Sequence, residues 1–119
     1  MHVLLKSAEQ VNVDSQTNAT ATATLATPGV GLKWRVTGWR ASYSGAAVSP
    51  GLRATVIGLE GVTIGRGVSS SDAWDVDLTG PIDGADNATV AISLPAGGVG
   101  AVGDVSIQAY RVSITLTDG

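Results

Sequence analysis

The sequence predicts an all-β protein, a single antiparallel β-sandwich of jelly-roll type with about eight strands. Val, Ile and Thr, whose branched side chains suit a pleated surface, recur in short runs. Turn residues such as Gly, Pro, Asn and Asp separate these runs at intervals of roughly eight to twelve residues, a spacing typical of sandwiches. No window of about 11 residues keeps a helical apolar repeat free of Gly or Pro. These three observations exclude a predominantly helical fold.

The first predicted strands lie in the N-terminal third of the chain. Residues 2–5 are a short apolar run that can pair at a sheet edge. Residues 18–26 alternate Ala and Thr, which places Ala21 and Ala23 on one face and threonines on the other. Small side chains on the inward face imply that another layer of the fold approaches closely.

A long strand is predicted over residues 32–44, with a break in its alternation. Trp34 and Val36 share one face, whereas Trp39 shares the other face with the residues that follow it. Gly38 lies between the two sets. We therefore predict a bulge or kink at Gly38 that redirects the side chains.

Two further runs read as a hairpin, and a third as a half-buried strand. Residues 52–59 and 62–68 flank Glu60-Gly61, a two-residue loop with Gly in second place that fits a tight turn. Residues 73–79 alternate regularly, with Trp74 inward and aspartates outward.

The last two predicted strands cover residues 87–94 and 104–116. The second of them begins with Ile107 inward and then changes parity to Val112. This change predicts a second kink near Tyr110-Arg111.

The domain organisation is simple. A chain of 119 residues suits one domain with a real core. We divide it into residues 1–17, an N-terminal arm or edge strand, and residues 18–119, the sandwich domain. No apolar run approaches the roughly 20 residues of a membrane-spanning helix, so no membrane partner is expected.

Composition excludes several classes of function. The net charge is −3 and no Lys/Arg cluster is present, whereas nucleic-acid binding calls for a basic stripe. The chain has no Cys and one His, which leaves no thiol nucleophile, no Cys-ligated zinc and little basis for a Ser-His-Asp triad or a multi-His metal site. We expect a protein that is not an enzyme and that holds no cofactor and no metal.

Five aspartates between residues 72 and 86 raise the question of a calcium site. Their spacing does not match an EF-hand loop and no closing Glu follows, so we interpret them as a solvated acidic face. Asp75 and Asp77 alternate on an outward face, which is more typical of a strand surface than of a glycosidase pair. The five residues are Asp72, Asp75, Asp77, Asp83 and Asp86.

The few aromatic residues carry much of the available apolar area. Trp39 and Trp74 are predicted core residues, because their strands alternate around them. Trp34 leaves two alternatives open, since Lys33 and Arg35 flank it. It is either a third core residue or an exposed anchor at a protein interface or against a sugar ring.

Residues 18–112 contain an ordered series of segments: the strand ATATATLA, a Lys-started strand ending in VTGWRASYS, the segment GPIDGADNATVAISL, and a Gly-rich turn leading into GDVSIQAYRV. In pattern and order this series resembles small virion proteins of tailed bacteriophages. The resemblance implies a non-enzymatic sandwich or jelly-roll subunit of the particle, often trimeric. It also implies decoration, or cementing, of the outer capsid surface as one such role.

The expected function is therefore structural. The protein would bind the major capsid protein and copies of itself, with a trimer favoured, and would bridge neighbouring capsid subunits. Two alternatives stay open: a neck or tail subunit of the virion, and a carbohydrate-binding module. The candidate interface residues are Val3, Leu5, Trp34, Arg35 and Arg40.

Overall fold

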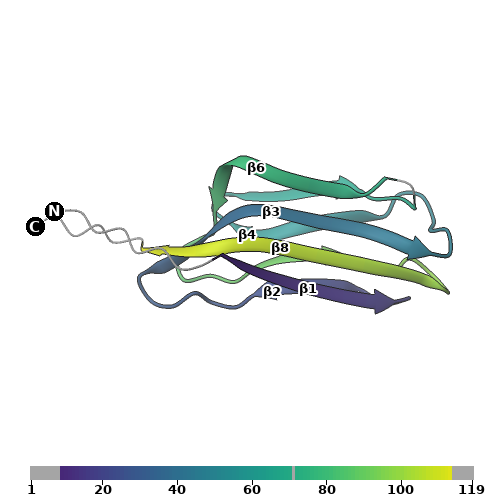
Figure 1. Ribbon diagram of the computed structural model, residues 1–119, viewed down its shortest axis with the longest axis horizontal. Coiled ribbons are helices and arrows are strands. Elements are labelled where there is room, and N and C mark those ends of the chain that lie inside the picture. Colours follow the sequence, from purple (N-terminus) through teal and green to yellow (C-terminus); the bar gives the residue numbers. More distant parts are fainter. Residues whose placement is uncertain (1–8, 71, 114–119) are drawn as a thin grey trace, which may run out of the picture.

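The computed structural model describes residues 9–70 and 72–113, and the regular elements there are all β-strands (Figure 1). The strands are β1 (Gln10–Thr17), β2 (Ala21–Leu25), β3 (Leu32–Gly45), β4 (Arg53–Leu59), β5 (Val62–Gly67), β6 (Trp74–Asp83), β7 (Val90–Leu94) and β8 (Ala101–Ser113). Within these residues, no helix has the length and apolar character needed to cross a membrane.

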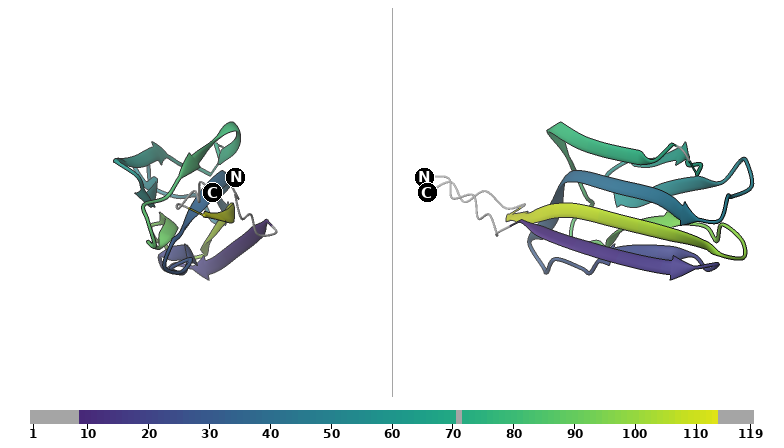
Figure 2. Two further views of the ribbon diagram at one scale, coloured as in Figure 1. Left: turned by 90° about the vertical axis from the view of Figure 1, so that its left-hand side faces the viewer. Right: turned by 45° about the vertical axis from the view of Figure 1, so that its right-hand side comes forward.

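The strands form two four-stranded antiparallel sheets that pack face to face (Figure 2). Sheet A has the order β1-β8-β3-β6, and sheet B has the order β2-β7-β4-β5. The pairs β1–β8, β2–β7, β3–β6 and β4–β5 are nested along the chain, as if one long hairpin had been wrapped into a sandwich. This is the jelly-roll arrangement, so the predicted fold class is confirmed.

The core between the sheets combines small and large side chains. Ala21 and Ala23 of β2 are buried, as the alternation of residues 18–26 predicts. Trp39 and Trp74 pack edge to face, with ring centroids 5.4 Å apart and planes inclined at 71°. Aromatic rings favour this geometry, and the prediction that both tryptophans are core residues is confirmed.

The bulge predicted in the long strand is present. The register of β3 with both β6 and β8 shifts between Val36 and Gly38. As a result Trp34, before the shift, and Trp39, after it, both point into the core. A Cβ atom at Gly38 would lie 2.6 Å from the Val76 carbonyl oxygen, so only glycine fits there.

The second predicted kink is wrong. From Ala109 to Ser113, β8 pairs with β3 in one unbroken register. Val112 therefore lies on the face of sheet A opposite to Ala109, beside Lys33, and it is buried there. The parity change in the sequence therefore reflects a buried apolar side chain, Val112, on the outer face of sheet A and not a bend in the strand.

Other strand bounds match or extend the predictions. The hairpin at Glu60-Gly61 is confirmed, since Leu59 pairs with Val62 and Gly61 has a left-handed φ of 70°. β6 runs to Asp83, beyond its predicted end, although its pairing with β3 is interrupted between Asp77 and Ile82. The predicted run at residues 2–5 lies outside the described residues. The described part of residues 1–17 includes β1, an edge strand of sheet A.

Candidate functional site

The outer face of sheet A brings charged, polar and apolar side chains together. The β-ladder aligns Val13 with Ser106, Ser106 with Arg40, and Arg40 with Asp75, so that one row crosses all four strands. Neighbouring strands in a sheet are about 4.8 Å apart, which makes the row a compact set of contact groups. We call this set the Arg40 row.

Arg40 occupies the centre of this face and is exposed. Two shallow hollows adjoin it, of about 590 Å³ toward β1 and about 330 Å³ toward β6. The larger hollow is lined by Val13 and Asp104, and the smaller by Asp77 and Gln108. Among the described residues Arg40 forms no ion pair, so its guanidinium is available to a partner.

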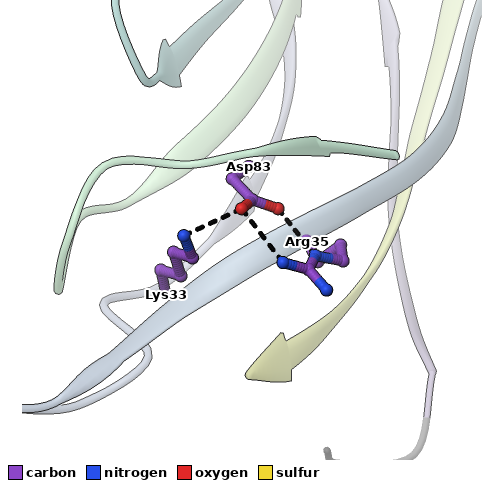
Figure 3. A network of polar contacts seen from close by, with 3 residues as sticks. All are labelled: Lys33, Arg35 and Asp83. Carbon is purple, nitrogen blue, oxygen red and sulfur yellow. Dashed lines mark hydrogen bonds and ion pairs between the residues drawn. The ribbon is translucent and has the colours of Figure 1, made fainter. Parts of the chain in front are cut away.

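Arg35, the second candidate arginine, is engaged within the protein. Its Nε lies 2.7 Å from Asp83 Oδ1 and its Nη2 lies 3.1 Å from Asp83 Oδ2, a bidentate contact between β3 and β6 (Figure 3). Lys33 Nζ lies 2.8 Å from the same Oδ2. Tyr110 forms a further hydrogen bond with Arg35.

The electrostatics of this group follow from the pairing. Hydrogen bonds from Arg35, and to a lesser degree from Lys33, hold the pKa of the Asp83 carboxyl below its ordinary value of 3.8, against the opposing effect of partial burial. Asp83 in turn raises the pKa of Arg35. The cluster therefore stays charged at neutral pH and joins β3 to β6.

Trp34 belongs to the core, which corrects its candidacy as a surface contact. Its side chain is 3% exposed, and its indole Nε1 donates a hydrogen bond of 2.7 Å to the Ala26 carbonyl oxygen. The Arg111 guanidinium lies 5.8 Å from the centroid of the indole ring. The flanking charges suggested exposure, but alternation places them on the opposite face of β3 from the indole.

The remaining sequence candidates divide between the surface and the undescribed part of the chain. Val3 and Leu5 lie outside the described residues. Asp72 pairs with Arg66 at 3.4 Å, on the surface. In the part of the chain that the structure describes, no three acidic or His side chains come together as metal ligands.

Sequence reasoning missed a feature where the two sheets meet. Asp14 Oδ2 accepts a hydrogen bond of 2.9 Å from the backbone N–H of Thr22, and Asn12 Nδ2 donates one of 2.6 Å to the carbonyl oxygen of Thr24. Both side chains come from β1, and both backbone groups belong to β2. The sequence signal that could have indicated these contacts is the alternation of Val with Asn and Asp in residues 10–14.

Comparison with known proteins gives little. No protein-family model and no curated protein matches the chain. The chain is similar to the protein FlhE, known from a crystal structure, with 12% sequence identity over 86% of this chain and 97% of that one, at a TM-score of 0.41. A likeness at this level carries no argument about function.

Proposed function

We propose that this protein is a non-enzymatic structural subunit of a tailed-bacteriophage virion, which decorates the outer surface of the capsid. The sequence resemblance over residues 18–112 supports this proposal. The fold is consistent with it, since a jelly roll presents broad sheet faces for docking.

One observation of geometry carries the proposal, the Arg40 row on the outer face of sheet A. The Arg40 guanidinium, which forms no ion pair within the described part of the chain, lies between an exposed apolar side chain, Val13, and an acidic side chain, Asp75. Arginine with apolar neighbours is favoured at protein interfaces, and the mixture of charges gives the contact its orientation. The surface therefore suits a protein partner, for which we propose the major capsid protein.

The mechanism that we propose is mechanical. Each copy would bridge adjacent capsid subunits through the outer face of sheet A and thereby oppose their separation. A single contact can be weak, because many linked contacts act together on one particle. Arg40 is the direct contact residue in this proposal, whereas Arg35 contributes the charge of a fixed ion pair and Trp34 supports the strand from the core. Val3 and Leu5 stay predicted contacts.

The copy number in the particle tests the proposed role. Quantitative mass spectrometry of purified virions of the phage that encodes the chain would compare this protein with the major capsid protein. If the number of copies per particle matches the number of equivalent sites on the capsid lattice, the result supports decoration. If it matches the symmetry of the neck or tail, the result supports that alternative. Absence from the particle overturns both.

A second experiment tests the surface. Virions assembled without the protein would be incubated with purified wild type, with Arg40→Ala and with Arg53→Ala, and the bound fraction would be measured by co-sedimentation. Arg53 is exposed on β4 of sheet B, so the control removes the same charge from the other sheet. We expect the first variant to bind at least about tenfold more weakly, as for an interface arginine, and the second to bind like wild type. Equal binding by both variants would contradict docking through sheet A.

The carbohydrate-binding alternative gains no support from the aromatic residues. Such modules stack exposed rings against sugars, whereas Trp34, Trp39, Trp74 and Tyr43 are all buried. Tyr110, the fifth aromatic residue, is partly exposed and hydrogen-bonded to Arg35.

A further inference from the structure

Among the described residues, no strand pairs with the outer edge of β1, and this edge differs from the other three sheet edges. All eight residues of β1 pair with β8 in one register without a shift. The strand contains no Pro, Gly, Lys or Arg, which are common blocks against further pairing. Its outer side chains Val11 and Val13 are 50% and 72% exposed. A long, regular edge of this kind is a template for another strand.

The other edges carry blocks. On β2, the backbone groups of Thr22 and Thr24 are occupied by side chains of β1. β6 contains Gly80-Pro81, where its pairing with β3 is interrupted. β5 is short and contains two glycines that flank Arg66. Within the described residues, β1 is therefore the edge best suited to pairing between molecules.

We propose that β1 pairs antiparallel with β1 of a second copy, about a two-fold axis at Asn12, so that two sheets A form one continuous sheet. In this register Val11 of each copy lies opposite Val13 of the other. Two such apolar cross-strand pairs would pack the valines side by side on the outer face of the joined sheet, and such pairs stabilise neighbouring strands.

The polar face of the strand also matches itself in this register. Asp14 is the one charged residue of β1, and it lies opposite Gln10 of the second copy, whose amide can donate a hydrogen bond to it. The two aspartates are kept apart, so no like charges face each other across the new ladder. This self-complementarity argues for a second copy as the occupant, since two-fold contacts place one patch against itself.

The inference rests on the proposed function in one respect: it specifies how copies of the proposed capsid subunit contact each other. A capsid lattice has local two-fold axes as well as three-fold ones, so a dimer can bridge two capsid subunits. It replaces the trimer expected from the resemblance with a two-fold assembly. The tests below use the purified protein alone, so their failure leaves capsid docking untouched, and failure of docking leaves the dimer untouched.

Sedimentation equilibrium over a concentration series tests the dimer. We expect wild type to interconvert between monomer and dimer. Val13→Lys should weaken dimerisation by about tenfold or more, because it removes two valine pairs and adds like charges near the axis. Val99→Lys makes the same change at an 88% exposed loop position outside the strands and should dimerise like wild type. A monomer at all concentrations, a trimer, or equal effects of both variants would overturn the proposal.

Cross-linking tests the register directly, because the chain has no cysteine of its own and the introduced thiols are the only ones that can form a disulfide. Oxidation of the double variant Val11→Cys/Val13→Cys should give covalent dimers, since opposite residues are within disulfide reach. The single variant Val13→Cys should give none, because diagonal positions are roughly 7–8 Å apart. Dimers from the single variant, or none from the double variant, would contradict this register.

Discussion

The carboxylate of Asp14 accepts a hydrogen bond from the backbone N–H of Thr22, which joins the edge strand of one sheet to the edge strand of the other. The side-chain amide of Asn12 donates a second hydrogen bond, to the carbonyl oxygen of Thr24. Side chains of β1 thus take the place of a neighbouring strand along β2. Because unpaired edges invite association, these contacts protect the edge of β2.

Replacing Asp14 should expose the Thr22 amide. In Asp14→Ala the N–H of Thr22 loses its acceptor, so its hydrogen exchange, measured by NMR, should become faster. Asn12→Ala is the control, since it removes a contact to the carbonyl of Thr24 and leaves the amide of Thr22 bonded to Asp14. Unchanged exchange in Asp14→Ala would show that the carboxylate does not protect this edge.

The ion pairs of Asp83 should contribute measurably to stability. Asp83→Asn weakens a bidentate contact to Arg35 and a contact to Lys33, both partly buried, and should lower the free energy of unfolding by about 1–2 kcal/mol in urea denaturation. The control is Asp72→Asn, whose pair with Arg66 is long and exposed. That change should alter stability by less than about 0.5 kcal/mol. Equal effects would mean that the Asp83 cluster is no stronger than a surface pair.

Stability should fall in acid because of the same carboxylate. The pKa of Asp83 is lower in the folded protein than its ordinary value of 3.8, so the unfolded chain binds a proton first. The stabilisation is therefore complete above that value and is lost as the pH falls through the lower folded pKa. Denaturation midpoints between about pH 5 and pH 2 should show a smaller loss in Asp83→Asn than in wild type. A profile identical to that of wild type would contradict this assignment.

Two glycines with nearly equal φ should respond very differently to alanine. Gly58 and Gly51 have φ of 89° and 88°, but a Cβ at Gly58 would collide with the Thr89 carbonyl oxygen, whereas a Cβ at Gly51 meets no atom within 4 Å. Gly51→Ala should cost about 1 kcal/mol of unfolding free energy from backbone strain alone. Gly58→Ala should cost about 3 kcal/mol or more. Comparable costs in chemical denaturation would refute the close approach of the two backbones.

The two buried tryptophans of β3 should also differ on substitution by phenylalanine. Trp34→Phe leaves the Ala26 carbonyl without its indole donor. The Nε1 of Trp39 is buried without a hydrogen-bond partner among the described residues, so Trp39→Phe removes an unsatisfied group. We expect Trp34→Phe to be the more destabilising by about 1 kcal/mol in thermal or chemical unfolding. The reverse order would indicate that Trp39 finds a partner in solution.

The sandwich itself could be predicted because its alternation is regular in most strands. Trp74 and its neighbours follow a simple in-and-out pattern, and the break at Gly38 identified the bulge from parity alone. β1 was harder, because Asn12 and Asp14 face the other sheet whereas Val13 faces solvent, which reverses the usual pattern. The reversal is explained by the Thr22 N–H and the Thr24 carbonyl oxygen of β2, which form hydrogen bonds with these polar side chains.

The candidate site was less accessible from the sequence. The contact of Arg35 with Asp83 joins residues 48 positions apart, so no local pattern signals it. Lys33 and Arg35 made their neighbour Trp34 look exposed, although alternation alone places it on the other face. Arg40 is the candidate whose exposure agrees with its proposed role. To predict that exposure, one must know which face of β3 is turned outward.

The extra residue in β3 also determines which change of length the strand should tolerate. The strand works as two halves in opposite phase, with Thr37 as the spacer between Val36 and Gly38. Deleting that one residue would remove the bulge and leave Trp34 and Trp39 an even number of positions apart, so strict alternation would keep both indoles on the core face. The bulge in this jelly roll is therefore required by the odd spacing of two tryptophans, and a single-codon deletion of Thr37 is the change of length that β3 should tolerate best.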